Sequence, residues 1–224
     1  MTLQKITKSL KPEGRRTYED ACGVAHALEL IGERWAPLVL RELMLGPRRF
    51  SELKADLPGI SANVLTQRLT DLEQRGLVRR TRLPPPASVQ VYEATAWGLE
   101  AAPVMRALGR WAVRSPRHDT GLFVSPVSIM MSMQTMFDPR RAKGFEARLA
   151  FCFGPRVYTV AVADGQMEVR QGSSEDADVV VESTPDQIAG VLYGGAPLDA
   201  LTFSGDKAVC ERFTKFFDFP DKAD

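Results

Sequence analysis

The sequence predicts an α+β protein with two domains, and three observations lead to this prediction. Residues 51–93 show two helical patterns followed by a hairpin of short strands. Residues 148–203 contain several segments of alternating hydrophobicity, which is typical of antiparallel strands. Charge is also divided unevenly, because residues 1–117 contain 19 Lys and Arg against 12 Asp and Glu, whereas residues 118–224 contain 10 against 16. A basic half and an acidic half indicate two parts with different roles.

The first helical patterns are short and lie close together. In residues 51–57, leucines four positions apart give a helix one face that can be buried. A proline and a glycine follow directly and end this helix. Ser61 then provides an N-cap, and neither proline nor glycine interrupts the chain before Gly76. Residues 61–75 are therefore predicted to form a second helix.

The second helix has an apolar face and a polar face. Leu65, Leu69 and Leu72 follow helical spacing and define the face toward the core. The opposite side and its flanks carry Asn63, Thr66, Gln67, Arg68, Thr70, Asp71 and Gln74. Amide, hydroxyl and guanidinium groups are the chemistry that contacts base edges in DNA. A polar helix face is nevertheless most often plain solvated surface, and Arg68 could simply pair with Asp71 or Glu73.

A basic hairpin follows this helix. Gly76 stands where a helix end requires positive φ, and an extended run begins after it. Arginines 79, 80 and 82 precede a turn of three prolines, and residues 88–93 return as the second strand. Arginines on such strands resemble a wing that lies along the phosphate backbone, although Arg79 could equally flank the core. Helix, turn, helix and hairpin in this order predict a winged helix-turn-helix, a unit that places side chains in the major groove.

The first half of the chain resembles the HxlR-type regulators of the wider MarR-like winged-helix group. The residues that carry the resemblance are Tyr18, Cys22, Gly32, Glu33, Arg34, Trp35, Arg48, Arg49, Phe50, Leu53, Pro58, Gly59, Ile60, Ser61, Leu65, Arg68, Leu69, Leu72, Gly76, Arg80, Tyr92, Gly98 and Trp111. One departure is Ala94, where the family usually has leucine, and it affects packing after the wing. The resemblance implies a homodimer on a palindromic operator in double-stranded DNA. Helices near the N-terminus and after the wing would form the subunit contact.

The polar helix face, the wing and the segment before the first helix together predict the DNA contacts. Recognition-helix residues would contact base edges, and the arginines before it and on the wing would contact phosphates. The expected contact residues are Arg48, Arg49, Ser61, Asn63, Thr66, Gln67, Arg68, Thr70, Arg80, Arg82 and Gln90.

The second half has a different pattern. Residues 127–137 carry methionine and phenylalanine at helical spacing. Thr184 opens a further helix, since Pro185 follows it and Gln187 completes a capping box. A closing helix after residue 206 carries phenylalanines on one side. Strands are expected at residues 148–153, 156–162, 167–169, 178–182 and 200–203.

This order of elements resembles that of sterol-carrier-protein-like domains, over roughly residues 123–219. The strand at 178–181, the capped helix and the segment 201–206 carry the resemblance. It implies an apolar cavity between sheet and helices for a lipid-like or other hydrophobic small molecule, and the unbranched methionine side chain suits such a cavity. The residues expected to line it are Met130, Met133, Phe137, Phe151, Phe153, Met167 and Phe213. A methionine-rich helix is more often plain core or an oligomer contact.

The chain is therefore expected to divide into three segments. Residues 1–17 form a basic N-terminal arm that either touches phosphates or is a solvated tail. Residues 18–114 form the HxlR-type DNA-binding domain, and residues 122–219 form the sterol-carrier-protein-like domain. A polar stretch that contains Pro116 and Gly121 separates the two domains.

No enzyme motif is visible. The two histidines, His26 and His118, stand in no recognisable nucleophile, metal or phosphate motif, so we expect neither catalysis nor a cofactor or metal. Cys22 and His26 are four residues apart, but two residues do not make a tetrahedral zinc site. Three scattered cysteines argue against structural disulfides. Because no apolar run approaches the ~20 residues that span a bilayer, we expect a cytoplasmic protein without a membrane partner.

The expected function is that of a sequence-specific, DNA-binding transcriptional regulator. It would act as a homodimer, modulated by a hydrophobic ligand in the second domain. The alternative is a carrier of lipids or hydrophobic ligands whose winged helix mediates protein contacts. A lesser alternative follows from the HxlR resemblance, since some members sense oxidants or electrophiles through a cysteine that matches Cys22; a packing role for Cys22 is preferred here.

Overall fold

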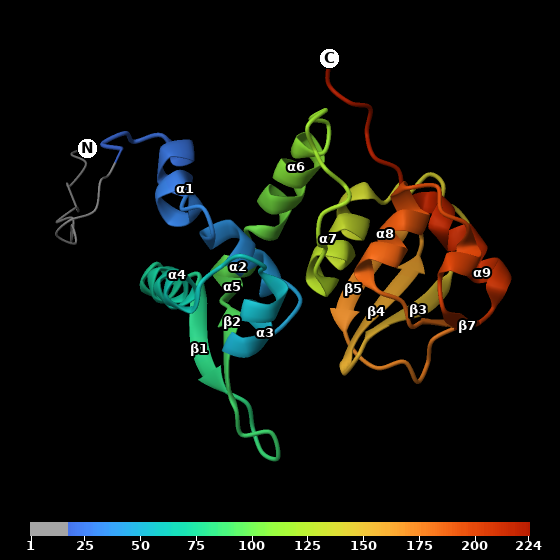
Figure 1. The fold of residues 1–224 in the computed structure, drawn as a ribbon, viewed down its shortest axis with the longest axis horizontal. Coiled ribbons are helices and arrows are strands. Elements are labelled where there is room, and N and C mark those ends of the chain that lie inside the picture. Colours follow the sequence, from blue (N-terminus) through green and yellow to red (C-terminus); the bar gives the residue numbers. More distant parts are fainter. Residues whose placement is uncertain (1–17) are drawn as a thin grey trace, which may run out of the picture.

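The structure is a computed structural model that describes residues 18–224 (Figure 1). The basic arm expected at residues 1–17 lies outside the described residues. In the first half the elements are α1 (Gly23–Ile31), α2 (Ala36–Glu42), α3 (Phe50–Asp56), α4 (Ala62–Gln74), β1 (Val78–Arg82), β2 (Gln90–Ala94), α5 (Ala96–Leu99) and α6 (Ala102–Ala112). In the second half they are α7 (Pro126–Met136), β3 (Ala147–Phe153), β4 (Arg156–Ala163), β5 (Gln166–Gln171), β6 (Val179–Val181), α8 (Pro185–Tyr193), η1 (Leu198–Ala200), β7 (Phe203–Gly205), α9 (Lys207–Phe213) and η2 (Thr214–Phe216).

Helices α3 and α4 form the predicted helix-turn-helix. The N-terminus of α4 is capped as expected, because Ser61 Oγ accepts a hydrogen bond from the Val64 N–H at 3.2 Å. Gly76 follows α4 with φ of +73°, which confirms that a residue tolerant of positive φ ends the helix. The leucine face of α4 is also confirmed, since Leu65, Leu69 and Leu72 are buried.

Strands β1 and β2 form the wing. They pair antiparallel, with Val78 opposite Ala94 and Arg82 opposite Gln90. A third segment joins the base of this hairpin, because the backbones of Arg48 and Tyr92 exchange two hydrogen bonds of 2.8 Å. The segment before α3 is thereby fixed to the wing.

The beginning of α5 is packed tightly against the start of the wing. Thr95 caps α5 and donates its hydroxyl hydrogen to the carbonyl oxygen of Gly76 at 2.7 Å. A Cβ atom on Gly98 would lie 2.0 Å from the carbonyl oxygen of Leu77, so this position accepts only glycine.

The second half is built on a five-stranded sheet in the order β5-β4-β3-β6-β7. Strands β3, β4 and β5 pair antiparallel, as predicted from the alternating hydrophobicity, and Asp164 and Gly165 lie in the turn between β4 and β5. Strand β6 pairs with the other edge of β3 and runs parallel to it. The prediction that all strands are antiparallel is therefore wrong for β6. The parallel pairing is possible because the connection between β5 and β6 carries the chain back along the sheet before β6 begins.

The position predicted for the last strand is wrong. Residues 200–203 were expected to be extended, but residues 198–200 form the short helix η1 after Pro197, and β7 occupies Phe203–Gly205. Pro197 is the N-cap of η1 and has an extended backbone, so the chain turns into the short helix directly after it. Gly205 is placed where a Cβ atom would lie 2.1 Å from the carbonyl oxygen of Asp178, so β7 approaches the backbone before β6 closely.

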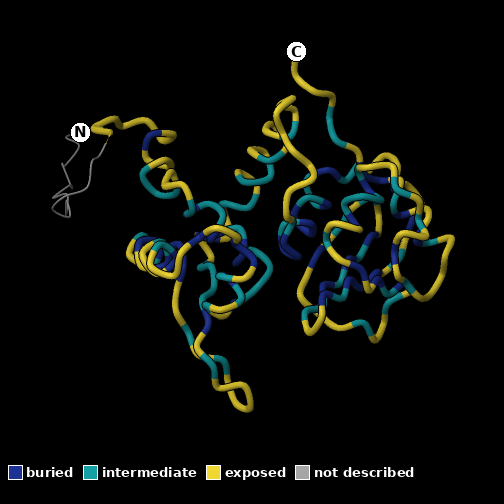
Figure 2. Tube along the Cα trace, in the orientation of Figure 1, coloured by how far each residue is buried: buried dark blue, intermediate teal, exposed yellow. Residues whose placement is uncertain are grey.

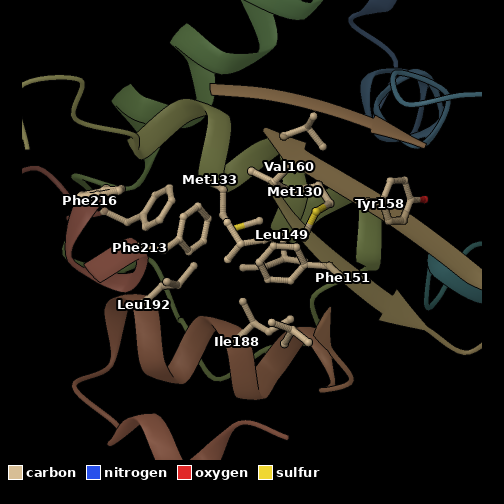
Figure 3. Packing of buried hydrophobic residues seen from close by; sticks show 14 of the residues in the cluster. Met130, Met133, Leu149, Phe151, Tyr158, Val160, Ile188, Leu192, Phe213 and Phe216 are labelled. Carbon is tan, nitrogen blue, oxygen red and sulfur yellow. The ribbon is translucent and has the colours of Figure 1, made fainter. Parts of the chain in front are cut away.

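The larger hydrophobic core lies between this sheet and helices α7, α8 and α9. Figure 3 shows Met130 and Met133 of α7 and Ile188 of α8 converging on Leu149 and Phe151 of β3. All five side chains are buried. The smaller core belongs to the first half and is formed by α2, α3, α4 and β1.

The two halves are in contact. Helix α6 packs against α7, and α7 also contacts α2. Partly buried Met44 and Met105 lie against both hydrophobic cores. Figure 2 shows that exposed residues run along α1, α6, the outer side of α4 and the tip of the wing.

Candidate nucleic-acid interface

The solvent-facing side of α4 gathers the polar residues expected to recognise bases. Asn63, Thr66, Gln67 and Thr70 are all exposed. Thr66 donates its hydroxyl hydrogen to the Ala62 carbonyl oxygen at 2.9 Å. Within residues 18–224, the side chains of Asn63 and Thr70 make no hydrogen bond, so their polar groups face solvent. This face can offer amide and hydroxyl groups to a groove.

Two members of the predicted set are held by acidic neighbours. Gln67 Nε2 donates to Asp71 Oδ1 at 3.0 Å, which leaves the amide oxygen of Gln67 for other partners. The Arg68 side chain is only 18% exposed and lies 3.2 Å from both Glu33 Oε2 and Asp71 Oδ2. The alternative that Arg68 pairs with Asp71 is therefore confirmed, whereas the pair with Glu73 is not present. Glu33 was not anticipated, because it comes from the turn before α2 and only the tertiary fold brings it to α4.

Arg48 cannot serve as the DNA contact that the sequence analysis predicted. The residue is only 3% exposed, and its guanidinium forms an ion pair with the Asp56 carboxylate. Arg48 Nη1 also lies 3.3 Å from the Tyr158 hydroxyl oxygen, to which it donates. The prediction was wrong because Arg48 and Arg49 are adjacent in an extended segment, where neighbouring side chains point to opposite sides. Arg49 is the exposed one.

The wing carries its exposed cations on β1, and β2 contains neither lysine nor arginine. Arg80, Arg82 and Gln90 are exposed, and Arg82 Nε donates to the Ser88 carbonyl oxygen at 2.9 Å. Arg79 is also exposed rather than set against the core, and its Nε lies 2.7 Å from Glu93 Oε1 on the opposite strand. Arg80 and Arg82 are the arginines of β1 that have no paired acid among the described residues. Contacts of this wing with phosphate remain a prediction.

Cys22 is exposed in the single chain, so no packing role for this residue is seen there. It occupies the N-cap of α1, where the backbone N–H groups of Ala25 and Val24 lower the pKa of the thiol. His26 does not turn to the thiol but lies 3.3 Å from Glu29 through its Nδ1 atom. Among residues 18–224, no cluster of three or more His, Cys, Asp and Glu side chains could hold a metal ion.

Helices α1 and α6 present large apolar side chains to solvent. On α6, Val104, Leu108 and Trp111 recur at helical spacing and are 59%, 54% and 71% exposed. On α1, Val24 and Leu28 are 69% and 48% exposed. Every residue of α6 is at least partly exposed, although the helix has a clear apolar side. Exposed apolar side chains that recur along one helix are typical of interaction surfaces.

The residues expected to line a ligand cavity lie in or against the larger core. Met130, Met133, Phe151, Phe153 and Phe213 are buried in it, and Phe137 and Met167 pack against it half-buried. The ring centroids of Phe151 and Phe213 lie 6.0 Å apart, so these side chains contact one another. A hollow in the surface lies elsewhere, at the end of α6, and is lined by Arg110, Trp111, Arg114 and Asp221 among others. The cavity therefore stays a prediction.

The two remaining cysteines belong to the second half. Cys210 is buried, and desolvation raises the pKa of its thiol to about 11. Cys152 is half-buried, and desolvation raises the pKa of its thiol as well. Burial thus favours the neutral form of both thiols, whereas the pKa of the Cys22 thiol is lowered.

Within residues 18–224, no helix is long and apolar enough to cross a membrane.

Comparisons with known proteins find relatives that match part of the chain. A family model described as HxlR-like helix-turn-helix matches residues 30–119. The uncharacterised HTH-type transcriptional regulator YvaP of Bacillus subtilis is 36% identical over 86 residues, which cover 38% of this chain and 80% of YvaP. The HTH-type transcriptional regulator YodB of the same species is 37% identical over 86 residues, which cover 38% of this chain and 77% of YodB. The solved structure of reduced YodB is 34% identical in sequence to this chain, with a TM-score of 0.39. The matched region covers 44% of this chain and 98% of the YodB chain.

Proposed function

The chain belongs to the HxlR-like helix-turn-helix family of transcriptional regulators, and we propose that it acts as a homodimer on a palindromic operator in double-stranded DNA. DNA binding in the service of transcription regulation is the function of this family, and it is favoured over the alternative of a carrier protein. The observation that carries the proposal is the exposed polar side of α4 beside a wing of exposed arginines. A helix with amide and hydroxyl groups can contact base edges, while the wing contacts phosphates.

The homodimer is supported by the apolar surfaces of α1 and α6. Val104, Leu108 and Trp111 would be costly to leave in water, and their spacing places them on one side of α6. A two-fold symmetric contact buries the same patch of both protomers and sets two α4 helices on successive half-sites of the operator. This arrangement matches the subunit contact that the sequence analysis predicted.

The test compares two kinds of variant on a duplex that the wild-type protein selects from a random pool. Replacement of both Arg80 and Arg82 by alanine should weaken binding to every duplex about equally and reduce the salt dependence, because phosphate contacts carry no sequence information. Asn63→Ala should instead relax the preference at one position of each half-site, with a loss of about 1–3 kcal/mol on the selected duplex.

The matched control is Arg140→Ala. Arg140 has an 89% exposed side chain, lies in the second half and pairs with Asp138, so its loss removes a positive charge away from the proposed interface. Binding and its salt dependence should match those of the wild type. If the wild-type protein binds no duplex even at low salt, the proposed function is wrong.

We further propose that residues 18–114 act as the DNA-binding domain and that residues 122–219 act as a sterol-carrier-protein-like domain that takes a hydrophobic small molecule. The separate hydrophobic cores of the two segments support this division. Mass spectrometry of molecules retained by the purified full-length protein tests the ligand. A bound apolar molecule is expected, and its absence after mild purification would argue against the ligand.

A thiol-sensing role for Cys22 is the second candidate function. Exposure and a lowered pKa favour it, because the thiolate is the reactive form of cysteine. Peroxide or an electrophile should change the DNA affinity of the wild-type protein and leave that of Cys22→Ser unchanged. Equal responses of both proteins would exclude the role.

A further inference from the structure

Polar side chains are buried where the winged helix meets the second half of the chain. We name this group the polar junction, and it comprises Glu42, Arg48, Asp56, Ser125, Arg156 and Tyr158. Five of them are almost completely buried, and the Arg156 side chain is 23% exposed. Arg156 and Tyr158 belong to β4, whereas Glu42, Arg48 and Asp56 belong to the winged-helix half.

Asp56 is the centre of the polar junction. Its Oδ2 atom accepts a hydrogen bond from Arg48, and Arg156 donates to Oδ2 at 2.5 Å and to Oδ1 at 3.2 Å. Two guanidinium groups from different halves of the chain therefore share one buried carboxylate. Bidentate contacts of this kind fix the angle between the groups as well as their distance.

Arg48 extends this connection to the wing. Its side chain contacts Asp56 at the end of α3 and the Tyr158 hydroxyl of β4, while its backbone pairs with Tyr92 of β2. One residue thus joins the base of the wing, the first helix of the helix-turn-helix and the sheet of the second half.

A second polar contact lies nearby. Ser125 Oγ donates to Glu42 Oε1 at 2.7 Å and accepts from the Ser128 N–H at 3.0 Å, so the N-cap of α7 is tied to the end of α2. Glu42 is also paired with Arg41. The polar junction consequently links the two halves at two separate points.

Buried ion pairs contribute little to stability on balance, since desolvation opposes the attraction between the charges. They do specify geometry, because their hydrogen bonds are directional. Among the described residues, Glu42 Oε2 and Arg48 Nε are buried without a hydrogen-bond partner. The polar junction therefore favours the placement of the two halves that keeps its remaining hydrogen bonds, which an apolar contact alone would not.

We propose that Arg156 is a positioning residue for DNA binding, which acts through Asp56 and Arg48 to hold α3 and the base of the wing against the second domain. The inference rests on the proposed function, because it concerns the geometry with which α4 and the wing meet DNA. Coupling between sites is reciprocal, so DNA binding must in turn favour the closed polar junction.

The first experiment measures DNA affinity of the full-length protein by fluorescence anisotropy, with the duplex selected by the wild type as the probe. Arg156→Leu should raise the Kd about fivefold or more, within the range of typical coupling between sites. Arg156→Lys should recover part of the affinity. Arg170→Leu is the matched control, since Arg170 lies on β5 with a 74% exposed side chain and should leave the affinity unchanged.

Action through Asp56 is tested with a double-mutant cycle. In an Asp56→Asn background, Arg156→Leu should cause little further loss of affinity. An Arg156→Leu protein that binds as the wild type does, or losses that simply add in the double variant, would overturn the inference.

A second measurement needs only the wild-type protein and therefore does not depend on the folding of any variant. Hydrogen exchange of the full-length chain is followed with and without the selected duplex. DNA should slow exchange at the amides of α3 and of residues 156–158. If DNA binds and exchange at these amides does not change, the inference is wrong while the proposed function stands. If the wild type selects no duplex, both fail.

Discussion

Replacement of Trp111 by alanine tests the homodimer most directly. Trp111 is the most exposed large apolar residue of α6, at 71%. It stands one turn after Leu108 on the surface that we assign to the subunit contact. Alanine keeps the helix, because it is the best helix former and Trp111 lies one residue before the end of α6.

The magnitude follows from the exposed surface. A tryptophan side chain has up to about 250 Å² of surface, so about 175 Å² of Trp111 faces solvent at an exposure of 71%. At about 25 cal/mol per Å², covering this area contributes about 4 kcal/mol per ring. The partner protomer covers the ring incompletely, and the alanine that replaces it still buries some surface. The expected loss of dimerisation free energy is therefore about 2–3 kcal/mol per ring, a typical value for a central interface residue. A symmetric dimer contains the change twice, so the dimer Kd should rise by a factor of about a thousand or more.

Sedimentation equilibrium measures this constant, and DNA binding provides an independent readout. The variant should be monomeric at concentrations where the wild type is a dimer. It should also bind the two half-sites of a palindromic duplex independently, without cooperativity. Trp97→Ala is the matched control, because Trp97 is 47% exposed but lies on α5. A Trp111→Ala protein that remains a dimer with an unchanged Kd would refute the assignment of α6 to the subunit contact.

Three further predictions concern the stability of the winged helix. Burial raises the pKa of the Glu42 carboxyl group above 4.5, although Arg41 and the hydrogen bond from Ser125 oppose the shift. The folded protein therefore keeps a proton that the unfolded chain has lost, and the free energy of unfolding falls as the pH rises from 4.5 through the raised pKa. Urea titrations of Glu42→Gln should show a weaker dependence of stability on pH, and an unchanged dependence would contradict this prediction. Gly98→Ala should destabilise the folded protein by about 3 kcal/mol or more in thermal unfolding, because the new Cβ atom would lie 2.0 Å from a backbone carbonyl oxygen. Gly109→Ala is the control, since this position has open space around it and the variant should be as stable as the wild type or more stable. Arg48→Met should lower the free energy of unfolding by about 3 kcal/mol, which is at the low end for a broken buried ion pair because Arg156 still pairs with Asp56. The folded variant should bind DNA with the same salt dependence as the wild type. A reduced salt dependence would indicate that Arg48 contacts a phosphate after all.

Local signals were sufficient for much of the fold. The capping residue before α4, the glycine after it and the leucine spacing within it all concern neighbours in the chain, and the structure confirms them. The capping box at Thr184 likewise opens α8 where it was expected. Strand pairing was harder, because the parallel partner of β3 and the late start of β7 depend on how distant segments meet.

The candidate site shows the same division between local and distant information. Residue type and period alone predict that α4 has a polar side and that the wing is basic. Which arginines are available depends on tertiary contacts: Arg48 is buried beside Asp56, Arg68 lies between Glu33 and Asp71, and Arg80 is exposed to solvent. The availability of a charge depends on its partners, and in this protein those partners lie as far away in the chain as β4 of the second half.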